Sequence, residues 1–165
     1  MPAEPKPEES ALDAWRSIVP LVRGMVARRS ERELDVRPEG APFTVREAVH
    51  HIAEANVVAG GIVIAALGSP GAVFDWSWML PFGPWMQRLR YDAKPVEPSL
   101  RLIDALNAYV AAQVEPLADG LERRVQLVDQ PGAPPRAATV ADVLRQEAEH
   151  ARGHAAELRA PGGSA

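Results

Sequence analysis

Two of the four histidines in this chain lie four residues apart near its C-terminal end. His150 and His154 occur in the segment EAEHARGH, residues 147–154, where helical spacing places both imidazoles on one face, one turn apart. Two imidazoles in this arrangement can bind one metal ion. The remaining histidines, His50 and His51, lie about a hundred residues earlier. If the two groups meet in space, they form a three-histidine metal site with room for a substrate.

Helical phase predicts which of these histidines face one another. At about 100° per residue, His51 lies on the flank of the apolar stripe of a helix that begins at Val45, whereas His50 lies near the opposite, polar face. His150 and His154 both lie on the edge of the stripe of a later helix. We therefore expect His51, His150 and His154 to converge and His50 to point elsewhere.

Two further polar residues project from the apolar faces of the same helices. Glu147 lies one turn before His150, and a buried carboxylate requires a compensating partner. Glu147 could orient His150, bind the metal directly or act as a base. Asn56 could hydrogen-bond to a metal ligand or to substrate. The competing interpretation is that both residues lie at the surface.

Four amphipathic helices are predicted to position these side chains. The first begins near Ser10 and is kinked at Pro20. The second runs to Leu67 from the capping box TVRE, residues 44–47. The third begins near residues 98–99, bends at Pro116 and carries apolar residues as far as Leu121; the fourth extends from Thr139 to about Ala160. Residues 124–128 could be extended, but they are too short and isolated to predict a sheet. The fold class expected is an all-α four-helix bundle.

A long, aromatic-rich connection, residues 69–97, separates the second and third helices. Long apolar connections are uncommon in compact domains unless they are functional. It could cap the core, with a short helix over residues 84–91, line a substrate pocket or form the interface of a homodimer. We select Trp78 and Trp85 as substrate-pocket residues.

Length and composition exclude several classes of function. The 165 residues suit one domain, with a disordered lead over 1–9, the bundle over 10–160 and a flexible tail over 161–165. A net charge of −4 without a basic stripe argues against nucleic acid. The longest apolar run, 57–67, is too short to span a bilayer, so we expect a cytoplasmic protein with no membrane partner. Because the chain has no cysteine, thiol chemistry would need a low-molecular-weight thiol as cosubstrate.

The segments TVREAVHHIAEAN (44–56) and TVADVLRQEAEHARGH (139–154) resemble the DinB-like superfamily of metal-binding four-helix bundles, which includes thiol-dependent maleylpyruvate isomerases and bacillithiol transferases. The resemblance covers about residues 10–160. It implies a divalent metal, most often zinc or nickel, bound by the histidine that precedes Ile-Ala-Glu, which is His51, and by the pair His150 and His154. Members often continue with Arg-Gly-Gln or Leu-Gly-Gln after the pair, whereas this chain has AAE at 155–157. No particular subfamily is therefore indicated.

Three neutral imidazoles leave a fourth metal position open, which is typical of catalytic rather than structural sites. The resemblance favours a thiol-dependent transferase or isomerase that acts on a small electrophilic substrate. The alternatives are a hydrolase that uses a metal-bound water, with Glu147 as base, and a non-enzymatic metal-binding stress-response protein. A di-iron carboxylate site built on the Glu-x-x-His segments 47–50 and 147–150 is rejected, because Glu47 and His50 are expected on a polar face.

Overall fold

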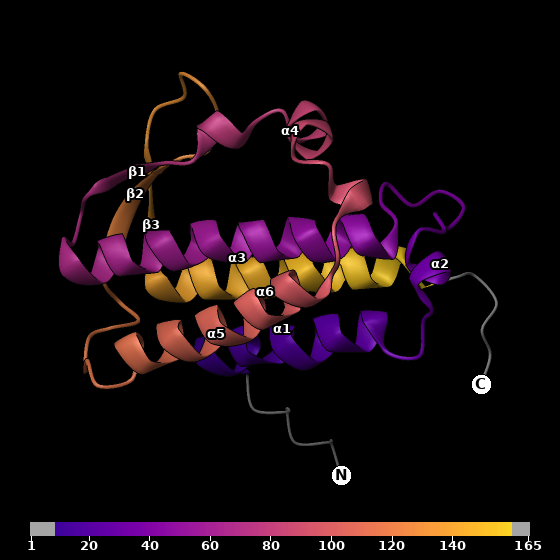
Figure 1. Ribbon diagram of the computed structural model, residues 1–165. Helices are drawn as coiled ribbons and strands as arrows, with labels where there is room; N and C mark the ends of the chain where they lie inside the picture. The colour runs from indigo at the N-terminus through magenta and orange to yellow at the C-terminus, as the bar shows by residue number, and fades with distance from the viewer. Residues whose placement is uncertain (1–8, 160–165) are drawn as a thin grey trace, which may run out of the picture.

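Four long helices form the body of the molecule in a computed structural model that describes residues 9–159 (Figure 1). They are α1 (Ala11–Val26), α3 (Val45–Gly68), α5 (Glu97–Val114) and α6 (Val140–Glu157). Helix α1 packs against α5 and α6, and α3 packs against the same two helices. The four-helix bundle predicted from the sequence is confirmed. Apart from Glu9, the predicted lead of residues 1–9 lies outside the described residues, as does the tail of 161–165.

Local sequence signals set the starts of three of these helices. Thr44 Oγ1 accepts from the backbone N–H of Glu47, and the Glu47 carboxylate accepts from the backbone N–H of Thr44, so the predicted capping box is confirmed. Thr139 caps α6 in the same reciprocal way with Asp142. Ser10 accepts from the Asp13 N–H at the start of α1. The Thr44 and Thr139 caps determine where α3 and α6, the helices that carry the histidines, begin.

The core lies where the four helices meet, and α1 and α5 are also joined by polar contacts. Trp15 Nε1 donates to the Asn107 carbonyl at 3.1 Å, and Asn107 Nδ2 donates to the Trp15 carbonyl at 2.5 Å. Both side chains are buried, so each satisfies a polar group that burial would otherwise leave unpaired. Among the described residues, the largest fully buried side chains are apolar or aromatic, and they include Trp15, Tyr91, Ile18, Leu34, Ile52, Ile103 and Leu144.

Helix α5 ends earlier than its apolar pattern indicates. It stops at Val114, and Leu117 and Leu121 lie in the turns that follow. Pro116 has no N–H to donate to the preceding turn, so it terminates the helix instead of bending it. Helix α1, by contrast, continues through Pro20. Helix α3 is long and apolar enough to cross a membrane by composition alone, but most of its apolar window is buried inside the bundle.

A three-stranded sheet corrects the all-α expectation. Strand β2 (Arg124–Val128) pairs in parallel with β1 (Val73–Asp75) and antiparallel with β3 (Arg136–Thr139). The segment rejected as isolated is therefore the central strand of a sheet. Its partners come from the 69–97 connection and from the residues before α6, so the pairing is invisible in a local sequence window. The sheet lies beside the C-terminal part of α3 (Figure 1).

The 69–97 connection is folded along most of its length. After β1 it forms the 3-10 turn η1 (Ser77–Met79), helix α4 (Phe82–Leu89) and the 3-10 turn η2 (Tyr91–Ala93). The short helix expected over residues 84–91 thus begins two residues earlier. A further short helix, α2 (Glu31–Leu34), precedes α3. In Figure 1 the connection runs back over the outer side of α3, and Phe82 at the start of α4 contacts the ring of His51.

Candidate metal centre

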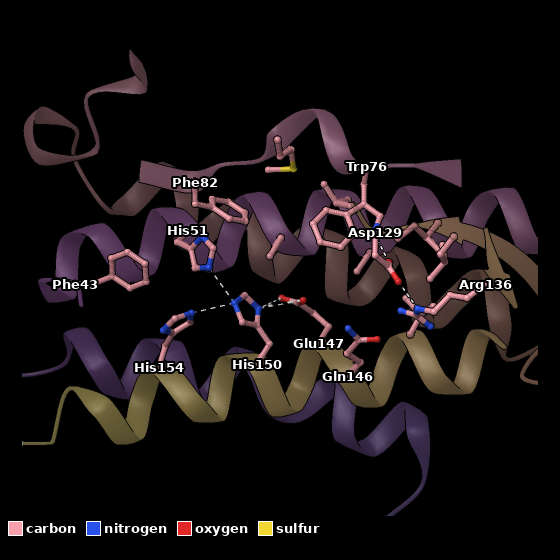
Figure 2. A pocket seen from close by; sticks show the side chains of 17 residues that line it. Phe43, His51, Trp76, Phe82, Asp129, Arg136, Gln146, Glu147, His150 and His154 are labelled. Carbon is pink, nitrogen blue, oxygen red and sulfur yellow. Dashed lines mark hydrogen bonds and ion pairs between the residues drawn. The ribbon is translucent and has the colours of Figure 1, made fainter. Parts of the chain in front are cut away.

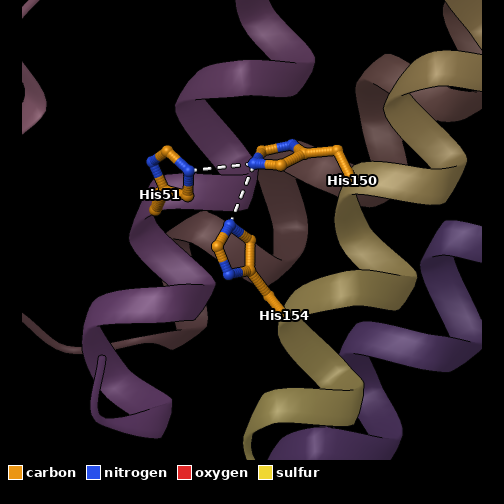
Figure 3. Close-up of side chains that lie close together, drawn as sticks. All are labelled: His51, His150 and His154. Atoms are coloured by element: carbon orange, nitrogen blue, oxygen red, sulfur yellow. Dashed lines mark hydrogen bonds between the residues drawn. The ribbon is translucent and has the colours of Figure 1, made fainter. Parts of the chain in front are cut away.

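Three imidazoles from two helices point at a common centre (Figure 3). His51 extends from α3, and His150 and His154 extend from successive turns of α6. The Nε2 atoms of His51 and His150 are 2.9 Å apart, and those of His154 and His150 are 3.0 Å apart. The structure thus brings together the three histidines selected from helical phase. One nitrogen from each ring could bind the same ion.

His50 lies outside this group, as helical phase predicted, but its surroundings differ from those expected. Its ring is only 4% exposed, with Nδ1 2.8 Å from Ser99 Oγ and Nε2 3.2 Å from the Lys94 carbonyl. The face of α3 taken as solvated is covered by η2 and the start of α5. His50 therefore links α3 to the start of α5 and to Lys94 after η2, away from the three other histidines.

Carboxylates behind two of the imidazoles determine which ring nitrogen faces the centre. Both carboxylate oxygens of Glu147 lie 3.3 Å from His150 Nδ1, and Glu157 Oε2 lies 2.9 Å from His154 Nδ1. A carboxylate accepts from Nδ1–H, which leaves the Nε2 lone pair free to bind a cation. His51 Nδ1 and Asn56 Oδ1 are the buried side-chain polar atoms without a partner in the described part of the chain.

Burial and mutual repulsion favour neutral rings at two of the three positions. Burial, followed by the charges that His150 and His154 would carry, lowers the pKa of His51 to about 3. Burial also lowers the pKa of His154, against the opposing contact with Glu157. At His150 burial again acts downward, but the hydrogen bond and charge of Glu147 outweigh it and the pKa is raised. A metal ligand must be unprotonated, so this distribution suits ligation by His51 and His154 directly.

The donor set fits a divalent ion. Zinc holds nitrogen ligands about 2.0–2.1 Å away, which separates tetrahedral ligand atoms by about 3.3 Å, so the Nε2 separations require only a small outward adjustment. Three lone pairs at hydrogen-bonding distance cannot all be satisfied by one another, whereas a cation satisfies them together. Imidazole ligands suit several divalent metals, zinc and nickel among them. His51, His150 and His154 would hold the ion.

Glu147 and Asn56 form a buried support behind the imidazoles. Glu147 is 8% exposed, and its Oε1 accepts from Asn56 Nδ2 at 2.8 Å while also facing His150. Asn56 also donates to the Ile52 carbonyl and is fully buried. Asn56 is not one of the cavity-lining residues, so its assignment to the substrate pocket stays a prediction that this cavity does not support. The sequence predicted that both residues lie on core faces. Their contact could not be predicted, because it joins α3 to α6 and neither helical pattern alone contains it.

The three histidines lie at one end of a cavity of about 390 Å³ (Figure 2). The volume suits a small organic ligand. The cavity is enclosed by α3, α6, the sheet and the 69–97 connection, and most of its wall is apolar. Its lining consists of Phe43, His51, Ala55, Val58, Ala59, Ile62, Trp76, Met79, Phe82, Leu127, Asp129, Arg136, Val143, Gln146, Glu147, His150 and His154.

Aromatic rings pack directly around the histidines, but they are not those selected from the sequence. The ring of Phe82 meets His51 edge-on with centroids 4.5 Å apart, and Phe43 contacts both His51 and His154. Trp78 and Trp85 do not line the cavity, so their selection as pocket residues stays a prediction that this cavity does not support. Trp78 is 61% exposed and packs on Trp85, whose Nε1 donates to Glu54 Oε2 at 2.5 Å. The alternative role of this connection in a homodimer interface stays a proposal.

Sequence reasoning also missed Asp129 and Arg136, which form the opposite end of the cavity in Figure 2. They flank the QPGAPP loop, residues 130–135, that joins β2 to β3. Two opposite charges on either side of a Pro-Gly turn are a usable signal, since a hairpin places such residues face to face. The signal was lost when the strand at 124–128 was rejected.

Comparison with known proteins supports the architecture. A family model described as the DinB superfamily matches residues 12–158. No curated protein sequence matches the chain. Among solved structures, YfiT from Bacillus subtilis superposes with a TM-score of 0.76 at 18% sequence identity, over 96% of this chain and 89% of that one. That protein is described as a probable metal-dependent hydrolase with an unusual four-helix bundle topology. At this identity the likeness establishes a shared fold.

Proposed function

Since the chain belongs to the DinB superfamily, we propose that it is a divalent-metal-dependent enzyme that transfers a low-molecular-weight thiol to a small electrophile, or isomerises a substrate through a thiol adduct. The observation that carries the proposal is the convergence of three imidazole Nε2 atoms at the end of a largely apolar cavity. A divalent ion there would leave one side open and would favour the anionic form of a thiol or a water at that side.

The chain's own residues suit thiol chemistry in three ways. The imidazoles of His51, His150 and His154 would hold the ion, and the rings of Phe43 and Phe82 exclude water from their outer side. A thiolate is a strong nucleophile once formed, so the protein need not supply a base at the moment of bond formation. The absence of cysteine requires the thiol to enter as a cosubstrate.

Glu147 supports a second candidate, a metal-dependent hydrolase. Its carboxylate lines the cavity beside the imidazoles and could take a proton from an attacking water. YfiT, the structural relative, is described as a probable metal-dependent hydrolase. Against this role, Glu147 already accepts from Asn56 and faces His150 Nδ1, which makes it a positioning residue first. We therefore rank thiol transfer ahead of hydrolysis.

One pair of assays separates these functions. Protein loaded with zinc or with nickel is mixed with a panel of low-molecular-weight thiols and a chromogenic electrophile, and thiol consumption is compared with that of chelated protein and of His154→Ala. A thiol transferase consumes thiol faster only when loaded. A hydrolase instead cleaves ester, amide or phosphoester probes with no thiol present. If the loaded protein shows no activity in either assay across a broad panel, the result would contradict the enzymatic proposal and favour a non-enzymatic metal-binding protein.

A further inference from the structure

The end of the cavity opposite the histidines is a polar cluster built at one edge of the sheet. Trp76 directly follows β1, Asp129 directly follows β2, and Arg136 begins β3. The parallel strands β1 and β2 end at this edge, and the antiparallel strand β3 starts there. All three side chains line the cavity. The sheet therefore brings together residues that lie up to sixty positions apart in the chain.

Hydrogen bonds hold Arg136 in a defined orientation. Trp76 Nε1 donates to Asp129 Oδ1 at 2.8 Å, and Arg136 Nε donates to Asp129 Oδ2. Each carboxylate oxygen of Asp129 thus has its own donor, one from the residue after β1 and one from β3. The Arg136 side chain is about half exposed at the cavity mouth, and within residues 9–159 its hydrogen bond to Asp129 uses only Nε. The terminal Nη1 and Nη2 groups remain available to a ligand.

A guanidinium presented in this way suits a carboxylate. Its two terminal amino groups form a planar fork that matches the two oxygens of a carboxylate. Asp129 orients the guanidinium by accepting from Arg136 Nε, and it leaves the Nη1 and Nη2 groups open. Between this end and the histidines the wall is formed mostly by aliphatic and aromatic side chains, with Gln146 and Glu147 as polar exceptions along α6 (Figure 2).

We propose that Arg136, held by Asp129 and Trp76, is a carboxylate-binding subsite that selects elongated, largely apolar substrates with a terminal carboxylate. Val143 and His150 line the cavity two turns apart on α6, which corresponds to about 10 Å along the helix axis. A substrate anchored at Arg136 would therefore present its opposite end to the histidines. The assignment of that opposite end as the reacting end rests on the proposed function, whereas binding at Arg136 does not require a metal.

The test is calorimetric binding of three matched probes, octanoate, octanamide and octylamine, to chelated protein. Octanoate is expected to bind, and Arg136→Gln should weaken it about tenfold or more, because a hydrogen-bonded charge partner is lost. Octanamide should bind wild type and Arg136→Gln alike. The matched control is Arg124→Gln, an exposed arginine at the far end of neighbouring β2, which should leave octanoate binding unchanged.

Arg136→Lys is a second variant, included in case Arg136→Gln disrupts the hairpin. It keeps a cation beside Asp129 but loses the planar fork. It should bind octanoate several-fold more weakly than wild type and retain the wild-type circular dichroism spectrum. The proposal is overturned if chelated wild type does not bind octanoate, if both Arg136 variants bind it as wild type does, or if octylamine binds in preference. Octanoate binding that appears only after metal loading would place the carboxylate on the metal and would equally overturn it.

The outcome of this experiment is independent of the outcome of the thiol and hydrolysis assays. Octanoate binding that depends on Arg136, together with silence in the thiol and ester assays, would support the subsite and contradict the enzyme. Thiol transfer or hydrolysis without any effect of Arg136→Gln on octanoate binding would support the enzyme and contradict the subsite.

Discussion

The three histidine rings are oriented by different kinds of contact. His150 is oriented by Glu147 and His154 by Glu157, whereas His51 Nδ1 is buried without a partner. His51 is instead fixed by ring contacts with Phe43 and Phe82. A metal here would thus be held by two ligands oriented through hydrogen bonds and one oriented by packing.

Removal of a single imidazole should abolish stable metal binding. We expect wild-type protein to take up about one zinc or nickel ion per chain and His51→Ala or His154→Ala to lose most of it, because two imidazoles leave the ion underbound. Metal analysis after desalting measures this. The control is His50→Gln, which alters the adjacent residue outside the centre. Full occupancy in the His51 or His154 variant would refute the site.

Glu147 should increase the metal affinity of the three histidines without being a ligand itself. Glu147→Gln keeps an acceptor near His150 Nδ1 but removes the negative charge, so metal affinity should fall by about 10- to 100-fold, the range for an outer partner of a metal-bound histidine. Competition with a chromogenic chelator measures the change. Glu149→Gln, an exposed carboxylate on the same helix, is the matched control. An unchanged affinity for Glu147→Gln would contradict the positioning role.

At the scale of elements, the position of α4 depends on a cluster under the 69–97 connection. The Tyr91 hydroxyl and the Trp85 indole both donate to Glu54 on α3. Burial, followed by the contact with Glu54, raises the pKa of Tyr91, so its hydroxyl stays protonated and remains a donor. Since Phe82 begins α4, this cluster also determines how closely that ring covers His51.

Removing one of these donors should loosen α4. Tyr91→Phe leaves the Glu54 carboxylate short of a donor, and we expect the free energy of unfolding to fall by about 1–3 kcal/mol. Urea denaturation measures the loss. Trp78→Phe is the comparison, because that indole is largely exposed and donates to the nearby Asp75 carbonyl, and it should change stability little. Equal effects of the two substitutions would argue against the cluster.

The sequence predicted the four helices and the face of α3 that carries His51 because their determinants are local, whereas the face that carries His50 is covered by segments distant in sequence. The Thr44 and Thr139 caps and the period of the apolar stripes fixed the phase of α3 and α6, and phase alone placed His51 on the correct side. The sheet was missed because its partners are distant in sequence. Trp76 could not be distinguished from Trp78, because the turn η1 interrupts the alternation after β1 and directs only Trp76 into the cavity.

At the scale of the whole molecule, the bundle should fold without metal. The four long helices share one continuous apolar core to which the imidazoles are peripheral. Chelated protein should keep most of its helical circular dichroism signal, and added metal should raise the melting temperature through preferential binding to the folded state. Loss of most of the helical signal on chelation would show instead that the metal is structural, which would undercut an open catalytic site.

The distribution of the four tryptophans gives the molecule a built-in optical reporter. Trp15 is fully buried in the core, Trp78 is largely exposed, Trp85 is half-buried against Glu54, and only Trp76 lines the cavity. In a Trp78→Phe background, the emission of Trp15 and Trp85 is expected to stay constant while that of Trp76 responds to what lies beside Asp129. A ligand at the Arg136 end should shift this fluorescence. A ligand confined to the histidine end should leave its wavelength unchanged, so one spectrum would locate an unknown compound within the cavity.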